Sequence, residues 1–397
     1  MSEIKVNAIT DASGGNTTTV NSVTPSTHTV KGRNLIINGA MEVAQRGTSH
    51  TTSVSTGYHT VDRIDIGGSS NVGQWTTSQD SDAPDGFTKS FKVECTTADT
   101  SFASTDHYGI MYMPEGHHMN PVGKGTSGAK SMTLSFYMKA NVSKTMVVEL
   151  TDAGNARHVN FAVTPSATNT WERIILNIPA DTSGGFNAGT NSIAGELNFW
   201  LAAGTNYTSG SNQSTWTART AANIVAGVSN WADTVGNAIW ITGLQLELGN
   251  VATEFDHRSF GEELALCQRY FFNPLFGRTT GSIYYPIHFN QVSTGNNGLL
   301  RWQVTFPVSM RSSPSFTHSL TDAKFQTSAP NGTDNWAFYR QNSGWSAKAG
   351  NSDISVLNIA PSVNQGNVGA YYVTPNDTLA TAIAIGGGAT FNFSSEL

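Results

Sequence analysis

Charged side chains are scarce in this chain of 397 residues. Asp, Glu, Lys and Arg make up 13% of the sequence, about half of the roughly 25% that is usual in globular domains. The formal net charge is −6, and no cluster of Lys and Arg occurs. Binding to the phosphate backbone of a nucleic acid needs such a cluster, so the composition argues against a nucleic-acid partner.

Long apolar runs are also missing. The apolar stretches are strand-sized, whereas a transmembrane helix needs about 20 such residues, so we expect no membrane insertion. The first residues, MSEIKVNAITDASGG, carry the charges of Glu3, Lys5 and Asp11 and lack the apolar segment of a secretory signal. If the protein works outside a cell, we therefore expect release by lysis rather than secretion.

Cysteine is nearly absent, with Cys95 and Cys267 as the two examples. Two cysteines cannot form the disulfide framework of a chain of this length. Cys95 follows an alternating strand pattern with Phe91 and Val93, and Cys267 lies on the apolar face of a predicted helix. The sequence therefore predicts two buried free thiols.

Short alternating segments separated by Gly, Ser, Thr and Asn dominate what is present. LSFYMKA (134–140) and WITGLQLEL (240–248) each have one apolar and one polar face, and GLLRWQVTFPVSM (298–310) belongs to a second series. Short strands without intervening helices indicate antiparallel sandwiches or jelly rolls. The predicted fold class is all-β, with two jelly-roll-like β-sandwich domains joined by one short helix.

That helix is predicted for RSFGEELALCQRYFF, residues 258–272. Ser259 is a good N-cap, and Glu262 three residues later completes a capping box. Phe260, Leu264, Cys267 and Phe271 recur at helical spacing and form one apolar stripe. The stripe is too short for a coiled coil, so the helix is interpreted as a connector. The predicted order is an extended N-terminal segment (1–31), a β-sandwich domain (32–256), the connector helix (257–272) and a C-terminal β-domain (273–397).

Several segments resemble one known family. NLIINGAMEVAQRGTS (34–49) and YHTVDRIDIG (58–67) resemble the opening of a carbohydrate-binding-module-like sandwich of bacteriophage tail-fibre proteins. ITGLQLELGNVATEFDHRSFGEELALCQRYF (241–271) is similar to the end of that module and its following helix, and FPVSMRSSPSFT (306–317) to the start of the distal β-domain. One departure is Ile64, where an aromatic residue often follows the Asp-Arg pair.

The resemblance implies a phage tail-fibre or receptor-binding protein located in the virion. It further implies a homotrimer with residues 1–31 attached to another tail or virion protein. The distal parts would face a host-surface glycan or protein. The leading hypothesis is a non-enzymatic adhesin. The alternatives are a structural virion protein, such as a tail adaptor or capsid decoration, and a polysaccharide depolymerase.

Histidines and carboxylates gather in STDHYGIMYMPEGHHMNP, residues 104–121. His107, His117 and His118 are weak candidates for metal ligands. The adjacent His117 and His118 cannot face the same way on a strand, and no HExxH spacing occurs. We therefore expect a polar surface loop and no metal, with histidines stacked at a trimer axis as an alternative.

Catalytic motifs are missing from the sequence. It has no GxSxG, Walker A, dinucleotide-binding or Cys-x-x-Cys motif, so no catalytic residue and no cofactor is expected. A depolymerase would need two carboxyl groups about 5 to 9.5 Å apart. The run QDSDAPDG (79–86) is typical of a turn, and Glu262 is assigned to the helix cap. Asp62-Arg63 is interpreted as a structural ion pair or as a source of strand-end hydrogen bonds.

Aromatic residues in polar loops are the stronger functional signal. Sugar-binding surfaces place aromatic rings against pyranose faces and flank them with polar side chains. GTNYTSGSNQSTWTART (204–220) contains Tyr207 and Trp216. The second group of receptor-binding candidates, preferred if the C-terminal domain forms the tip, is Trp336, Tyr339 and Trp345. The alternative is that Trp336 and Phe338 alternate into the core and leave only Tyr339 and Trp345 exposed.

Overall fold

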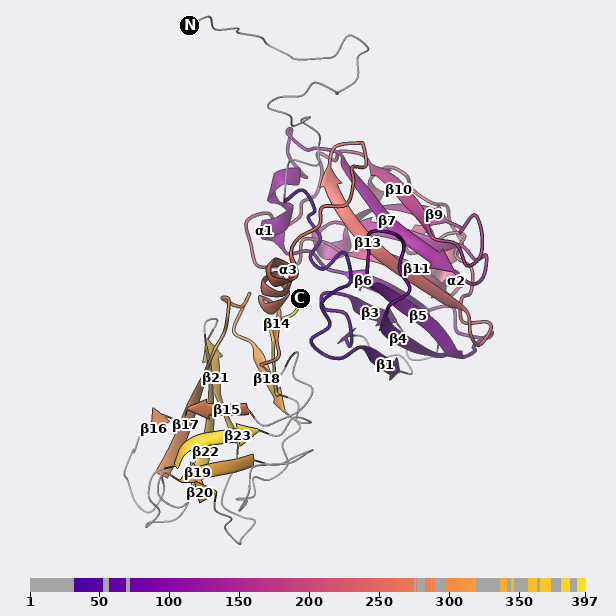
Figure 1. The fold of residues 1–397 in the computed structure, drawn as a ribbon. Coiled ribbons are helices and arrows are strands. Elements are labelled where there is room, and N and C mark those ends of the chain that lie inside the picture. The colour runs from indigo at the N-terminus through magenta and orange to yellow at the C-terminus, as the bar shows by residue number, and fades with distance from the viewer. Residues whose placement is uncertain are drawn as a thin grey trace, which may run out of the picture. The chain divides into compact units, whose positions relative to one another are not determined.

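The chain forms two compact units in a computed structural model (Figure 1). The structure describes residues 32–397 except 53–56, 69–71, 275, 277–282, 287, 290–297, 319–335, 341–343, 346–355, 363–364, 373–379 and 386–390. For residues 52, 316 and 318, and for the described residues from 283 to 304 and from 336 to 391, it describes the backbone alone. The first unit contains the described residues up to Glu42, from Ser49 to Gly57 and from Ile64 to Ser259; the second contains Val43–Thr48, Tyr58–Arg63 and the described residues from Phe260 onward. The predicted N-terminal segment lies outside the described residues.

The first unit is a sandwich of two antiparallel sheets, which confirms the predicted all-β fold (Figure 1). The six-stranded sheet has the order β1 (Ser49–Thr52), β4 (Gln74–Asp80), β5 (Ser90–Thr97), β13 (Ala238–Leu248), β7 (Met132–Ala140) and β10 (Glu172–Ile178). The seven-stranded sheet has the order β12 (Thr217–Ala218), β9 (Arg157–Val163), β8 (Met146–Thr151), β11 (Leu197–Ala203), β6 (His107–Tyr112), β3 (Asp65–Gly68) and β2 (Gly57–Tyr58). Short helices connect these strands: α1 (Gly116–Met119), η2 (Asn120–Val122), η3 (Ala153–Asn155), α2 (Thr205–Thr208) and η4 (Ala221–Asn223).

The inner faces of the two sheets form the core of the sandwich. Alternate residues of a strand point to opposite faces, so the apolar positions of each strand are buried together. Phe136 of β7 contacts Phe199 of β11 edge to face, with ring centroids 5.3 Å apart. Trp75 of β4 stacks on Tyr108 of β6 at 4.3 Å. These pairs join one sheet to the other.

The longest segment of the second unit starts with helix α3 (Phe260–Gln268), which confirms the predicted helix with shorter bounds. The predicted apolar stripe is only partly correct. Cys267 is buried together with Glu263, but Phe260 in the first turn is 47% exposed. Phe271 is buried from a strand, because the helix ends before it.

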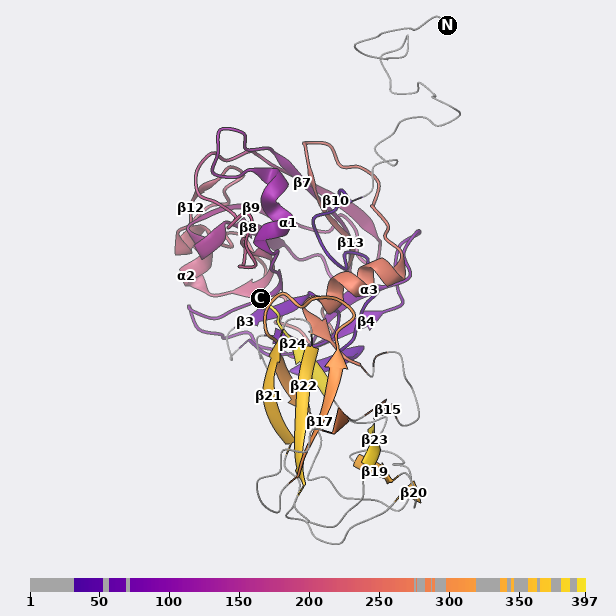
Figure 2. The same ribbon diagram turned by 90° about the vertical axis from the view of Figure 1, so that its left-hand side faces the viewer.

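Three antiparallel sheets make up the rest of the second unit (Figure 2). The first sheet has the strand order β14 (Phe271–Phe272), β24 (Phe391–Ser394) and β18 (Ser315–His318). The second has the order β15 (Ile283–Pro286), β23 (Ala380–Ile385), β19 (Trp336–Arg340) and β20 (Gly344–Trp345). The third has the order β16 (His288–Phe289), β17 (Gly298–Thr305), β22 (Gln365–Tyr372) and β21 (Val356–Ser362). Residues 43–48 and 58–63, which the sequence analysis assigned to the sandwich domain, group with this unit.

A buried ion-pair cluster joins the distant segments of the second unit. The guanidinium of Arg63, which is fully buried, donates to one carboxylate oxygen of Glu396 and lies 3.7 Å from the ring centroid of Tyr270. Arg46 donates to the other oxygen at 3.1 Å and lies 3.5 Å from the ring centroid of Phe271. The motif that resembles phage proteins thus contributes both arginines to one structural contact.

Asp62 belongs to the same cluster. Its two carboxylate oxygens accept hydrogen bonds from the backbone nitrogen and the side-chain amide of Gln45, at 2.9 and 2.5 Å. Burial raises the pKa of Asp62 to about 6, and the nearby Arg46 opposes this rise. The predicted ion pair between Asp62 and Arg63 is therefore replaced by pairs with distant partners: Asp62 lies 3.6 Å from Arg46, and Arg63 binds Glu396.

Both cysteines are free and buried, as predicted. Burial raises the pKa of Cys95 to about 11 and that of Cys267 well above its usual range. At pH 8 only about one Cys95 thiol in a thousand is ionised, and the thiolate is the reactive form. We expect the native protein to resist a thiol-specific chromogenic disulfide at pH 8, and the urea-unfolded protein to react at both sites. Rapid reaction of the native protein would contradict this burial.

No helix among the described residues is long and apolar enough to cross a membrane.

Candidate functional site

The outer face of the seven-stranded sheet is covered by the segment that follows β11. Val147 of β8 and Trp200 of β11 are cross-strand partners on this face, because Phe199 next to Trp200 points into the core. Ile224 and Val225 of the covering segment pack on them. The nitrogen of Val225 donates to the carbonyl of Tyr207 at 3.0 Å, which fixes α2 against the end of η4.

Glu149 of β8 is fully buried under this cover and accepts hydrogen bonds from four side chains. The donors and their distances are His158 Nδ1 at 2.8 Å, Arg219 Nε at 2.8 Å and Nη2 at 3.2 Å, Trp200 Nε1 at 3.0 Å and Asn198 Nδ2 at 3.3 Å. Burial alone raises the pKa of Glu149, but the hydrogen bonds and the positive charge of Arg219 outweigh it and hold the pKa below its usual range. Glu149 is therefore an ionised carboxylate that positions Trp200 and Arg219.

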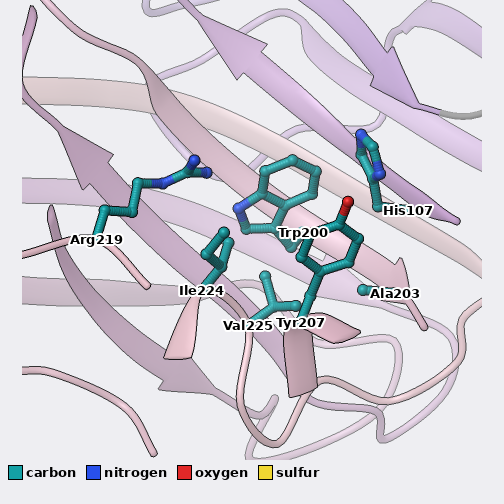
Figure 3. A pocket seen from close by; sticks show the side chains of 7 residues that line it. All are labelled: His107, Trp200, Ala203, Tyr207, Arg219, Ile224 and Val225. Carbon is teal, nitrogen blue, oxygen red and sulfur yellow. The ribbon is translucent and has the colours of Figure 1, made fainter. Parts of the chain in front are cut away.

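A half-open pocket of about 130 Å³ lies beside this carboxylate (Figure 3). At about 30 Å³ per molecule, it has room for about four waters. Figure 3 shows Trp200 at its centre, Arg219 on the side of the indole nitrogen, and His107 on the opposite side. The side chains that line it are His107, Trp200, Ala203, Tyr207, Arg219, Ile224 and Val225.

The pocket has an apolar wall and a polar rim. Trp200, Ile224 and Val225 are buried and supply the wall. The imidazole of His107 meets the rings of Trp200 and Tyr207 edge to face, each with centroids 5.4 Å apart. The structure thus brings together Tyr207, predicted as a receptor contact, and His107, predicted as a weak metal candidate.

Trp216, the other candidate from the same loop, lies in the core. Its side chain is 8% exposed, and Nε1 donates to the carbonyl of Pro179 at 2.9 Å. One ring contact is with Phe186, at 6.0 Å between centroids. The ammonium of Lys124 lies 4.2 Å from the centroid of the indole. The indole ring therefore packs inside the protein and does not form a receptor-binding surface. The polar composition of the loop did not indicate that this side chain folds back into the core.

Lys124 occupies a small anionic cage next to this indole. Its Nζ lies 3.0 Å from Asp181 Oδ2 and 3.5 Å from Asp152 Oδ2, and it donates to the carbonyl of Ser183 at 2.8 Å. Asp181 also binds Arg157 through two nitrogens, at 2.8 and 3.2 Å. Burial acts to raise the pKa of Asp181, but the bonds from Arg157 and Lys124 outweigh it and lower that pKa.

We expect Lys124→Met to lower the free energy of unfolding by about 2–3 kcal/mol. The methionine keeps the aliphatic packing but leaves the anions of the cage with fewer donors, and Arg157 limits the loss. Urea denaturation followed by tryptophan fluorescence measures the change. Lys130→Met, an exposed lysine six positions along the chain, is the matched control. Equal free energies of unfolding for the two variants would show that the contacts of Lys124 in the cage do not stabilise the protein.

The other metal candidates do not meet His107 in a ligand group. His117 and His118 lie on α1, with His117 exposed. Within the described residues, no group of three or more His, Cys, Asp and Glu side chains is arranged to hold a metal ion.

Trp336, Tyr339 and Trp345 lie on strands β19 and β20 of the second unit. The backbone register pairs Tyr339 with Trp345. Their side chains lie outside the described part of the structure, so their role in receptor binding stays a prediction.

Two carboxylates of the predicted turn at 79–86, Asp80 and Asp82, have structural partners. Asp80 accepts a hydrogen bond from Trp240 Nε1 at 3.1 Å. Asp82 accepts one from Trp171 Nε1 at 3.0 Å and pairs with Lys139. The bond from Lys139 lowers the pKa of Asp82. These contacts anchor the turn to the six-stranded sheet.

The sequence analysis missed Glu149, Trp200 and Arg219. One signal could have found the first. Glu149 stands in MVVELT, where every residue is buried, and a carboxylate inside an apolar strand needs several donors. No local pattern connects it with Arg219, which is 70 residues away.

Comparisons with known proteins bring no family assignment. No protein-family model matches the chain, and no curated protein matches it. Similar solved structures include a tailspike protein 4 enzymatically active domain of bacteriophage CBA120, with a TM-score of 0.30 and 14% identity, covering 55% of this chain and 22% of that one. The chain thus spans about a fifth of the length of that tailspike domain.

Carbohydrate-binding modules are also among the similar structures. TmCBM61 in complex with β-1,4-galactotriose has a TM-score of 0.26 and 11% identity, covering 55% of this chain and 99% of the module. A family 4 module has a TM-score of 0.24 and 15% identity, covering 44% and 87%. Because identity is this low, the site is interpreted from its own residues.

Proposed function

We propose that this protein binds a glycan through the pocket in Figure 3 and acts as a non-enzymatic adhesin. The observation that carries the proposal is the combination of an apolar wall with polar groups at one small opening. A pyranose ring has an apolar face of C–H groups and a rim of hydroxyls, so it suits such a surface. The partly exposed ring of Tyr207, with the small accessible part of Trp200, would contact the apolar face, and His107 and Arg219 the hydroxyls.

The biological setting of the proposal is a phage virion. The family resemblance of residues 34–67 and 241–317 supports a tail-fibre or receptor-binding protein that attaches the virion to a host cell surface. A homotrimer, attached to another tail or virion protein through residues 1–31, would present three copies of the pocket. Weak binding at each copy then suffices, because linked sites raise the overall avidity by orders of magnitude.

The proposal assigns no catalytic residue to the pocket. Glu149, which bonds to the lining residues Trp200 and Arg219, is fully buried, and four side chains bind its two oxygens. A general acid or base must reach the glycosidic oxygen or a water. The bonds around Glu149 instead hold it in a structural position.

Tyr207→Ala tests the binding site. We expect the variant to bind a bacterial surface glycan about tenfold more weakly than the wild type, which corresponds to about 1.4 kcal/mol. A glycan array with the full chain identifies the ligand, and titration calorimetry measures the affinities. Trp171→Ala is the matched control and should bind normally, because Trp171 is a partly buried aromatic that lies just before β10 of the other sheet.

Binding that survives Tyr207→Ala but is lost in Trp336→Ala or Trp345→Ala would place the receptor site in the second unit, as the sequence analysis preferred. Absence of binding to any array glycan or host cell would favour a structural virion protein.

A further inference from the structure

We infer that the pocket takes one neutral sugar residue at the end of a glycan, a hexose or 6-deoxyhexose, rather than an acidic sugar or an internal part of a chain. The inference rests on the proposed function and specifies the ligand class of the same pocket.

The first argument is the charge of the pocket. Arg219 is its one cationic lining residue besides the histidine, among the described side chains. Nε and Nη2 of Arg219 bind the two oxygens of Glu149 at 2.8 and 3.2 Å. The buried carboxylate thus compensates the guanidinium, and the positive charge is not available to attract an anion.

An acidic sugar would meet a second obstacle. Its carboxylate would have to share Arg219 with Glu149, and two carboxylates at one guanidinium repel each other. A cationic amino sugar is disfavoured too, because no carboxylate lines the pocket among the described residues. An uncharged ligand is not repelled by Glu149 and needs no carboxylate in the pocket.

The second argument is the size of the pocket. The half-open pocket of about 130 Å³ can receive part of one sugar ring and has no room for several consecutive residues. The lining residues come from separate elements: Ala203 from β11, Tyr207 from α2, and Val225 from the loop after η4. A pocket of this size suits a chain end or a single-residue branch better than the middle of a chain.

The third argument is the polar network under the wall. His158 Nε2 and Asn198 Oδ1 are buried and have no hydrogen-bond partner among the described residues. Both side chains bond to Glu149, at 2.8 and 3.3 Å. Neither lines the pocket, so we expect ordered water at these two atoms, which would extend the hydrogen-bond network toward a neutral hydroxyl.

The test uses the full chain and methyl glycosides of neutral hexoses and 6-deoxyhexoses, each hexose beside its uronate, in titration calorimetry. We expect the best neutral glycoside to bind at least tenfold more tightly than its uronate. A trisaccharide ending in the same residue should bind within about threefold of the monosaccharide. Ala203→Phe, which fills the pocket, should abolish binding, and His107→Ala should weaken it while the exposed control His117→Ala does not.

Two results would overturn the inference and leave the proposed function standing. One is tighter binding of the uronate that is lost in Ala203→Phe. The other is an affinity that rises steadily with chain length. If neither the glycosides nor any array glycan binds the folded wild type, the proposed function fails and the inference with it. Thermal unfolding checks that each variant is folded, and His107→Ala serves if Ala203→Phe is not.

Discussion

Glu149→Gln should lower the free energy of unfolding by about 3–5 kcal/mol, the usual cost of removing one partner of a buried ion pair. Glutamine has nearly the same shape, so the loss measures the charge. Arg219 and His158 would then face an amide where they now donate to a carboxylate at 2.8 Å each. The amide nitrogen would also point at a donor, because four side chains donate to the two oxygens of Glu149.

Urea denaturation measures this change, with Glu94→Gln as the control. Glu94 forms a partly exposed pair with Lys92 on the other sheet, and such pairs contribute about 0–1 kcal/mol. The double variant Glu149→Gln with Arg219→Met should recover part of the lost stability, because it removes both charges. Equal stability of Glu149→Gln and Glu94→Gln would contradict the structure of this network.

The contribution of Glu149 to the free energy of unfolding depends on pH with a defined sign. The folded-state pKa of Glu149 lies below its unfolded value of 4.5. The ionised carboxylate therefore contributes stability above about pH 4.5, and this contribution is lost as the pH falls through the folded-state pKa. The wild type should lose more stability than Glu149→Gln between pH 5 and pH 3. Parallel curves for the two proteins would contradict the lowered pKa.

Features set by neighbouring residues could be predicted from the sequence. Helix α3 was found because Ser259, Glu262 and the apolar spacing lie within one short segment. The strands were found because their period of two is local as well. The burial of Cys95 followed from the alternation within β5, and the structure confirms it.

The pocket could be predicted only in part, because its residues meet across long sequence separations. Tyr207 was found through the polar composition of its loop, but Trp216 in the same loop turned out to be buried. Composition does not reveal which aromatic folds back against Lys124. No sequence pattern indicated a role for Arg219, because its partner Glu149 is 70 residues away in the chain.

The Asp62-Arg63 motif shows the same limit. The sequence indicated a structural pair within the motif, yet Arg63 pairs with Glu396, which is 333 residues away. The pairing of Arg63 depends on the strands that bring residues 391–397 beside Tyr270, and the motif itself contains no information about these strands. The nitrogen of Ser395 donates to the carbonyl of Tyr270 at 2.7 Å and fixes this contact.

Glu396→Gln should accordingly loosen the second unit by about 3–5 kcal/mol, because it removes the negative charge between two buried guanidinium groups. The side chains of Arg63 and Arg46 are 0% and 11% exposed, so water cannot replace the lost carboxylate. Arg311 still donates to the carbonyl oxygens of Ser395 and Glu396, at 2.7 and 2.8 Å. The backbone should therefore stay in place while its local stability falls.

Hydrogen exchange followed by mass spectrometry measures this change peptide by peptide. We expect protection in residues 43–48, 58–63 and 391–397 to fall by about two to three orders of magnitude, since each 1.4 kcal/mol corresponds to a factor of ten. Peptides of the sandwich should keep their protection. Glu262→Gln is the control, because glutamine also completes a capping box. Unchanged exchange in residues 43–48 and 58–63 would mean that the ion-pair cluster does not hold these segments in the second unit.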